Sequence, residues 1–204
     1  MPFHYEILVE EPSMEAYLDQ VLPRLVSGGD STSVHCYRGK GDLLRKLPDR
    51  LSGYSQWIPD NYRIVILIDR DDDDCRELKN RLEQIAFISG LKTRTQSNNE
   101  VWSVANRVAI EELEAWFFGD WAAVQAAYPR VSSNIPRQVK YRDSDAITGG
   151  TWEAFERILQ RGGYHKTGLQ KIKAARLIGS ATEPERNRSH SFRVFANVFT
   201  RPDA

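Results

Sequence analysis

Three acidic residues stand directly after two apolar segments in the N-terminal half of the chain. Glu10 follows the short apolar segment 5–9, and Asp69 and Asp71 follow the continuous apolar run 63–68. Carboxylate oxygens are preferred ligands of Mg²⁺, Mn²⁺ and Ca²⁺, and converging carboxylates repel one another unless a cation neutralises them. Asp69 and Asp71 are two positions apart, so in an extended chain their side chains share a face. The pattern therefore indicates a divalent-cation site.

The elements that must position these acids alternate between strand and helix signals. Strands are predicted over 5–9, 33–37, 63–68 and 101–110, with amphipathic helices between them. The continuous apolar character of 63–68 favours a central parallel strand covered on both faces. This alternation predicts an α/β fold with a mostly parallel sheet flanked by helices. Ligands of such sheets bind beyond the carboxyl ends of the strands, where Glu10, Asp69 and Asp71 stand.

The second part of the chain has a different character and charge. Residues 1–130 contain 15 Lys and Arg against 21 Asp and Glu, a net charge of −6, whereas residues 131–204 contain 13 against 7, a net charge of +6. A polar, turn-rich stretch from about 130 to 150 precedes predicted helices at 151–161 and 168–178 and a last helix with Phe192 and Phe195. We expect an α/β domain over 1–130 and a basic helical extension over 131–204 packed on it.

Several classes of protein are excluded or disfavoured. No run of 18 apolar residues could form a membrane-spanning helix, and the N-terminus carries acids where a signal peptide needs basic residues. Cys36 and Cys75 lack metal-type spacing and are too few for a disulfide framework. We therefore expect a protein of the reducing cytoplasm.

Three segments carry a resemblance to a known family. LVEEPSMEAYL and VILIDRDDD are similar to the Toprim pattern, in which a glutamate ends one strand and Asp-x-Asp ends another. Together with NRVAIEELEAWFFGD, they resemble the prokaryotic family called domain of unknown function 4276. The resemblance implies a Toprim-like fold and Mg²⁺- or Mn²⁺-dependent phosphodiester cleavage, as in nucleases of the overcoming-lysogenization-defect type. Glu10, Asp69 and Asp71 are then the metal ligands and catalytic acids.

The resemblance also implies partners and shows two departures. Such families are often encoded beside an AAA-type ATPase, which implies a two-component antiviral or genome-maintenance system acting on nucleic acid, with DNA expected and a homo-oligomer left open. The residue after the first acid is usually Gly, and here it is Glu11. The nuclease branch places a second acid where Met14 stands, and Glu15 is the candidate to replace it.

Other residues are additional candidates for the site. Glu111 and Glu114 are three apart and would share a helix face, so Glu114 is a catalytic candidate and Glu111 an additional acid. The alternative is that both only favour the dipole of a helix start. Three basic residues are candidates for phosphate binding, although lysines on helices are often simply solvated: Lys166, Lys171 and Lys173.

Alternative functions stay open from the sequence. The Asp-rich segment after 63–68 could be a solvated turn in which Asp74 caps the next helix. A haloacid-dehalogenase-type phosphatase also has two Asp after a strand, but Asp73 stands where its motif has Thr or Val. A non-catalytic module that docks on the ATPase and a small-molecule phosphohydrolase are the two alternatives to a nuclease.

Overall fold

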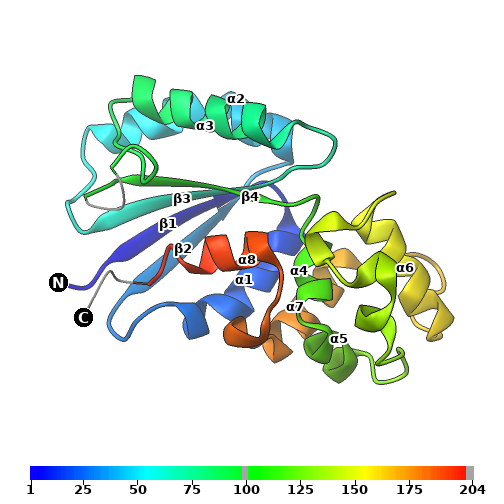
Figure 1. Cartoon of the computed structure of the whole chain (residues 1–204). Helices are drawn as coiled ribbons and strands as arrows, with labels where there is room; N and C mark the ends of the chain where they lie inside the picture. Colours follow the sequence, from blue (N-terminus) through cyan, green and yellow to red (C-terminus); the bar gives the residue numbers. More distant parts are fainter. Residues whose placement is uncertain (98–100, 201–204) are drawn as a thin grey trace.

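A single parallel sheet organises the computed structural model, which describes residues 1–97 and 101–200. Within these residues the strand order is β2-β1-β3-β4, and every neighbouring pair is parallel (Figure 1). The strands are β1 (His4–Val9), β2 (Ser31–Cys36), β3 (Tyr62–Asp69) and β4 (Val104–Ala109). The predicted α/β fold with a mostly parallel sheet is confirmed, including the neighbouring positions of the first and third strands.

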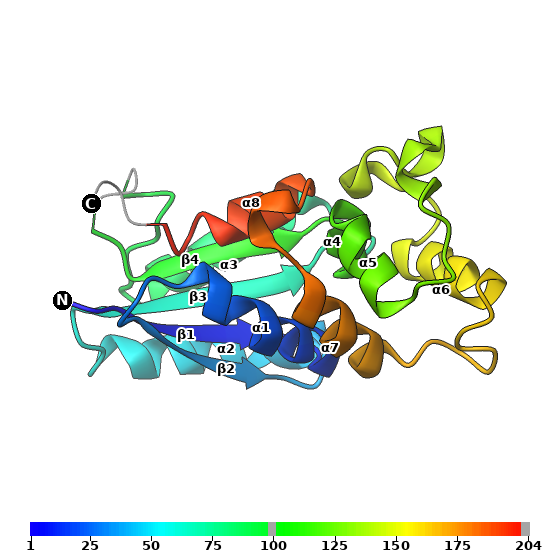
Figure 2. The same cartoon turned by 90° about the horizontal axis from the view of Figure 1, so that it is seen from below.

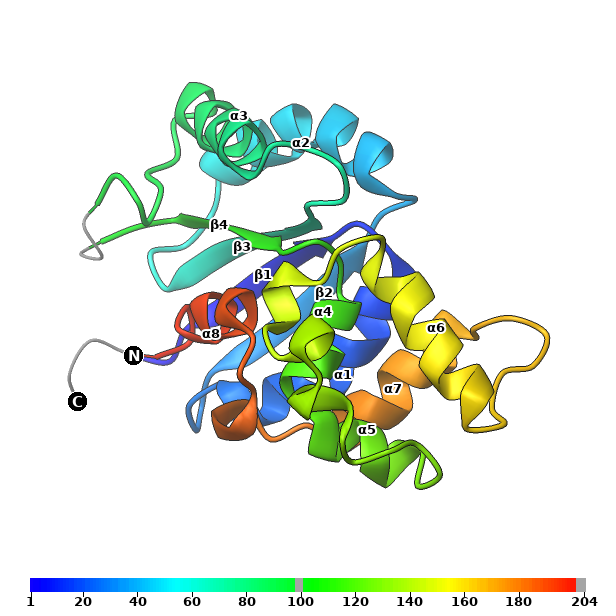
Figure 3. The same cartoon turned by 45° about the vertical axis from the view of Figure 1, so that its right-hand side comes forward.

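Helices cover both faces of the sheet (Figures 1 and 3). One face carries α2 (Lys40–Ser55) and α3 (Cys75–Ile88). The other carries α1 (Pro12–Leu25), α7 (Lys171–Ala181) and α8 (His190–Ala196). Beyond the carboxyl ends of the strands lie α4 (Glu114–Gly119), α5 (Trp121–Ala127) and α6 (Thr151–Arg161). The polar stretch before α6 contains the short 3₁₀ helices η1 (Ile135–Arg137), η2 (Val139–Tyr141) and η3 (Ser144–Ala146), and η4 (Pro184–Arg186) precedes α8.

The residues of β3 show why its sequence is continuously apolar. Val65 and Leu67 join the core beneath α1, and Ile66 and Ile68 join the core beneath α2 and α3. Side chains alternate between the two faces of a strand, so a strand covered on both faces needs apolar residues at every position. This burial fixes the register of β3 and therefore the place where Asp69 leaves the sheet.

The C-terminal helices share the larger core with the first half of the chain. Figure 2 shows α7 beside α1, and the ring of Phe192 in α8 packs against that of Trp116 in α4, with centroids 5.2 Å apart. Their core residues belong to one cluster that also contains Ile7 and Val9 of β1. The predicted division of the chain at residue 130 stays a prediction, because a shared core does not define a boundary.

Two predicted helix positions are wrong. The expected helix over 168–178 spans Lys171–Ala181, because residues 168–170 have no regular secondary structure and Gly168 has a positive φ of 117°. Glu111 and Glu114 do not share a helix face, because α4 begins only at Glu114. Glu111 is instead held before the helix by an ion pair with Arg70, whose Nη2 lies 3.1 Å from its Oε1.

A close approach at the end of α4 generates a stability prediction. A Cβ on Gly119 would lie 2.8 Å from the backbone nitrogen of Ser189, because the segment before α8 crosses the helix there. Since backbone has to move, Gly119→Ala should lower the free energy of unfolding by about 2 kcal/mol. Urea denaturation measures the change. Gly53→Ala in α2 is the matched control, because a Cβ there meets nothing within 4 Å and should stabilise the helix by up to about 1 kcal/mol. Equal stabilities of the two variants would contradict the close packing of Gly119 against the backbone of Ser189.

Candidate metal centre

Parallel pairing of β1 with β3 brings Glu10 and Asp69 together at one edge of the sheet. Val9 pairs with Leu67, so the two strands end side by side. The Oε1 atom of Glu10 accepts a hydrogen bond from the backbone nitrogen of Asp69 at 2.5 Å. Both acidic residues are only 5% exposed. The pairing predicted from the sequence therefore places the Glu10 carboxylate against the backbone of Asp69 and keeps both acidic side chains out of water.

Glu114 adds a third buried acid to this pair. It begins α4 beyond the strand ends and is 1% exposed. Its charge and that of Glu10 act on Asp69, where both raise the pKa of the carboxyl. Glu10, Asp69 and Glu114 are the buried acids at this edge, and we call them the carboxylate cluster; the charges of Glu11 and Asp71 also raise the pKa of Asp69.

Burial shifts the pKa of every member of the carboxylate cluster upward. Burial raises the pKa of Glu10 to about 7, although the hydrogen bond from Asp69 and the charge of Lys40 act in the opposite direction. Burial likewise raises the pKa of Glu114 to about 7, against the opposing charge of Lys171. Burial and the neighbouring acids raise the pKa of Asp69 well above its ordinary value. Charged carboxylates at this site therefore need a compensating cation.

Asp71 is exposed and so is not one of the buried acids of the carboxylate cluster, but its charge raises the pKa values of Glu10 and Asp69. Its backbone has a positive φ of 49°, which turns the chain after β3. The Nζ atom of Lys40 lies 2.6 Å from Oδ2 of Asp71 and 2.9 Å from Oδ2 of Asp73. Burial lowers the pKa of Lys40, but hydrogen bonds to these two acids outweigh it and leave the pKa raised. Lys40 is thus a fixed cation beside the cluster.

Lys40 is a site residue that the sequence interpretation missed. It begins α2, directly after the turn that follows β2, and Gly39 donates a backbone hydrogen bond to the carbonyl of Glu10. The available signal was the segment RGKG after a predicted strand, because loops after parallel strands meet at the same edge. Its position in such a loop was enough to make Lys40 a candidate site residue.

The oxygen atoms of the carboxylate cluster fit a divalent cation in their chemistry. Oδ1 of Asp69 and Oε2 of Glu114 are buried without a hydrogen-bond partner in the described residues. Buried polar atoms normally have partners, and hard cations such as Mg²⁺ are bound by such oxygens. In the same residues, no three His, Cys, Asp or Glu side chains are arranged to share one metal ion. Binding of a divalent cation therefore requires side chains to move. Asp71 is the exposed acid nearest to Asp69 in the sequence, and it forms an ion pair with Lys40.

Lys171 lies at the carboxylate cluster. Its Nζ is 3.8 Å from Oε1 of Glu114, and it lies over the ring of Trp152, 5.1 Å from the centroid. Its pKa is raised, because the charges of Glu114 and the other acids outweigh the effect of burial. Lys171 was predicted to bind phosphate, and in this structure its charge partly neutralises the acids. Lys166 and Lys173 are exposed.

The additional acidic candidates, Glu15 and Glu111, are both half-buried and do not belong to the carboxylate cluster. Glu15 is half-buried on α1, and its charge adds to the effect of burial in raising the pKa of Cys36 in β2. Glu111 pairs with Arg70 and accepts a hydrogen bond from Thr151. The neighbouring Glu112, which the sequence interpretation did not single out, accepts hydrogen bonds from Thr151 and from the backbone of Trp152. Glu111 and Glu112 therefore anchor the start of α6.

Comparisons with known proteins give one family and one solved structure. The family model described as Domain of unknown function (DUF4276) matches residues 9–200. The C-terminal region of the Burkholderia pseudomallei OLD protein is similar over 96% of this chain and 98% of that chain, with 16% sequence identity and a TM-score of 0.41. No curated protein matches the chain. In the described part of the chain, every helix is too short or too polar to cross a membrane.

The raised pKa values predict how stability depends on pH without metal. Glu10 and Glu114 have pKa values of about 7 in the fold against an ordinary value of 4.5, so between these pH values the folded state binds more protons than the unfolded state. The free energy of unfolding should therefore fall as pH rises from about 5 to 8, and Glu114→Gln should reduce that fall by about 1–3 kcal/mol. Urea denaturation in EDTA at both pH values measures it.

The control for this measurement is Glu185→Gln, which changes an exposed glutamate in η4. It should leave the pH dependence of wild type unchanged. If the free energy of unfolding falls by the same amount between pH 5 and 8 in Glu114→Gln as in wild type, ionisation of Glu114 does not destabilise the fold.

Proposed function

This protein belongs to the DUF4276 family, and on that premise we propose that it is a Mg²⁺- or Mn²⁺-dependent nuclease that cleaves phosphodiester bonds. The observation that carries the proposal is the carboxylate cluster at the carboxyl edge of a parallel sheet. Two of its buried oxygen atoms, Oδ1 of Asp69 and Oε2 of Glu114, have no hydrogen-bond partner in the described residues. Mutually repelling acids kept out of water are typical of sites that act on a charged partner.

The residues divide into three roles in this proposal. Glu10, Asp69 and Asp71 would hold the cation, and Asp71 would have to exchange its ion pair with Lys40 for the metal. A divalent ion held by these residues would supply Lewis-acid chemistry, polarising the scissile phosphate and lowering the pKa of an attacking water. Glu114, with a pKa of about 7 raised by burial, is suited to accept the proton of that water near neutral pH. Lys40, released from Asp71, is a cation placed to contact a phosphate oxygen.

Basic residues of the C-terminal part supply the proposed contact with nucleic acid. Residues 131–204 carry a net charge of +6, and Lys166 and Lys173 are exposed. Contacts between such side chains and phosphates act through counterion release and do not depend on sequence. DNA is the proposed substrate, and an AAA-type ATPase in the cytoplasm the proposed partner, within an antiviral or genome-maintenance system.

A non-catalytic docking module is the second candidate. The ion pair of Lys40 with Asp71 favours it, because a lysine in that position neutralises an acid without a metal. In that case the cluster is a structural feature and the chain serves the ATPase as a binding partner.

Metal binding is tested by thermal unfolding with Mg²⁺ or Mn²⁺. A cation that binds only the folded state stabilises it by mass action and so raises the melting temperature. At a cation concentration a hundred times the Kd, the free energy of unfolding rises by about 2.7 kcal/mol. Asp69→Asn should abolish this increase and should leave the metal-free protein as stable as wild type or more so. Asp72→Asn is the matched control, because Asp72 is exposed in the same loop, and it should keep the increase. An unchanged response in Asp69→Asn would place the ion elsewhere.

Cleavage of plasmid DNA and RNA tests the activity itself. Glu10→Gln and Asp71→Asn should each reduce the Mn²⁺-dependent rate by about a hundredfold or more, since each removes a proposed ligand, while Asp72→Asn should retain it. Lys166→Ala should weaken substrate binding and reduce its salt dependence. If DNA and RNA stay intact with the ATPase also present, the docking module is favoured. Phosphate release from small phosphomonoesters would instead indicate a small-molecule phosphohydrolase.

A further inference from the structure

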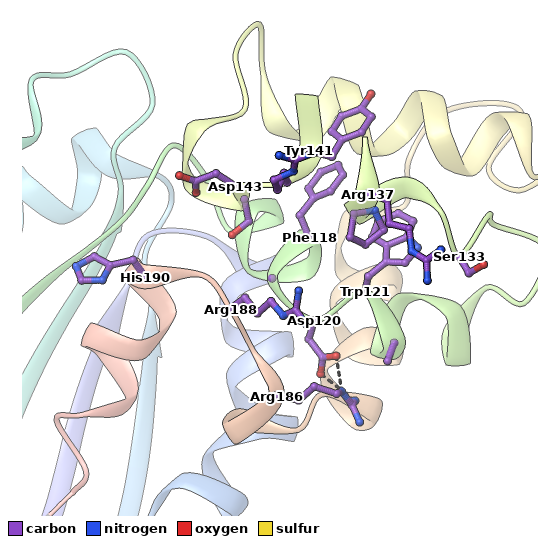
Figure 4. A pocket seen from close by; sticks show the side chains of 15 residues that line it. Phe118, Asp120, Trp121, Ser133, Arg137, Tyr141, Asp143, Arg186, Arg188 and His190 are labelled. Carbon is purple, nitrogen blue, oxygen red and sulfur yellow. Dashed lines mark hydrogen bonds and ion pairs between the residues drawn. The ribbon is translucent and has the colours of Figure 1, made fainter. Parts of the chain in front are cut away.

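A cavity of about 590 Å³ lies at the junction of α4 and α5 (Figure 4). Its other walls come from residues 133–144 and 186–190, and no member of the carboxylate cluster lines it. Ligand pockets of proteins usually have volumes of about 300–1,000 Å³. The cavity is therefore large enough for a small molecule or for one unit of a polymer, and it is a separate site.

The charged groups of this cavity are mainly guanidinium groups. Arg186 is neutralised, because its Nε and Nη2 donate to the two carboxylate oxygens of Asp120 at 2.6 and 2.9 Å (Figure 4). The side chains of three more arginines line the cavity and form no hydrogen bond or ion pair within the described part of the chain: Arg137, Arg142 and Arg188. We call this cavity the arginine pocket.

The acids of the arginine pocket do not balance these cations. Asp120 is 1% exposed and engaged by Arg186. Asp143 accepts a hydrogen bond from the backbone of Asp145 at the start of η3. Three arginines without an ion pair in the described residues therefore line the pocket together with one remaining carboxylate, that of Asp143. Guanidinium groups match the geometry of phosphate oxygens and can contact them with two parallel hydrogen bonds, so the pocket favours an anion that carries more than one negative charge.

Stacked aromatic rings form the apolar wall of the arginine pocket. The ring of Phe118 stacks on Tyr141 and on Trp121, with centroids 5.2 and 5.5 Å apart. All three side chains are nearly buried, and the indole nitrogen of Trp121 donates to the carbonyl of Ser132. The wall is therefore held in place before any ligand arrives, which reduces the entropy lost on binding. Only small parts of these rings are exposed, and beside guanidinium groups they fit a ligand with a phosphate and a compact sugar-like or apolar part.

We propose that the arginine pocket binds a phosphate-bearing nucleotide unit, either a free nucleotide or a unit of a nucleic-acid strand. Arg142 and Arg188 contact the phosphate, and the exposed edges of Phe118, Trp121 and Tyr141 contact the sugar or base. The inference does not depend on the carboxylate cluster, because none of its residues lines the pocket. If the protein is also a nuclease, the pocket holds substrate or an effector away from the cleavage site.

Titration calorimetry with AMP and with adenosine in EDTA tests the proposal. AMP should bind, and adenosine, which lacks the phosphate, should bind at least about tenfold more weakly. Arg142→Ala and Arg188→Ala should each weaken AMP binding about tenfold or more, and Arg188→Lys should weaken it less, because it keeps the charge. Arg81→Ala is the matched control, since it removes an exposed guanidinium from α3 on the opposite side of the sheet.

Competition identifies the source of the phosphate, and further results would overturn the proposal. A 5′-phosphorylated oligothymidylate that displaces AMP, or that binds where AMP does not and loses affinity in Arg188→Ala, indicates a strand. Binding of AMP alone indicates a free nucleotide. No binding of either probe, equal binding of AMP and adenosine, or equal losses in Arg81→Ala and Arg188→Ala would each overturn the proposal. Asp69→Asn should bind AMP as wild type does, which separates this result from failure of the proposed nuclease.

Discussion

The electrostatic repulsion among buried carboxylates at the ends of β1 and β3 is the constraint around which this structure is arranged. Glu10 and Asp69 leave neighbouring parallel strands, and Glu114 covers them from α4. Keeping charged carboxylates out of water is unfavourable unless cations or hydrogen bonds compensate for it. The chain compensates with the backbone nitrogen of Asp69 for Glu10, while neighbouring oxygens keep no partner in the described residues. The acidic side chains of this site are therefore held in place by the fold, while some of their oxygen atoms have no hydrogen-bond partner in the described residues.

Two lysines from distant parts of the sequence supply cations beside this cluster. Lys40 begins α2 and pairs with Asp71, whereas Lys171 begins α7 and lies near Glu114. The second contact depends on the packing of α7 against α1, which brings the C-terminal part to the edge of the sheet (Figure 2). The C-terminal helices therefore contribute directly to the electrostatics of the site as well as to the core.

The short helix α4 connects the carboxylate cluster with the arginine pocket. Its first residue is Glu114, and its last, Gly119, lines the pocket, so the two sites lie about one and a half helical turns apart along the chain. Every residue of α4 is buried. Asp120, which follows it, is fixed by Arg186 and by the backbone of Glu183. Because α4 is buried and Asp120 is held at its end, the helix fixes the position of the carboxylate cluster relative to the arginine pocket.

The sequence by itself determined the alternation of strands and helices, the central place of β3 and the meeting of Glu10 with Asp69. Apolar periodicity specifies which faces are buried, and parallel strands bring their carboxyl ends to one edge. Only the tertiary structure decided that Asp71 pairs with Lys40, that Lys171 lies against Glu114, and that Arg142 and Arg188 share a pocket with Phe118. These contacts join loops and helix ends far apart in the chain, where no periodic pattern exists and packing of the whole core sets the positions of the side chains.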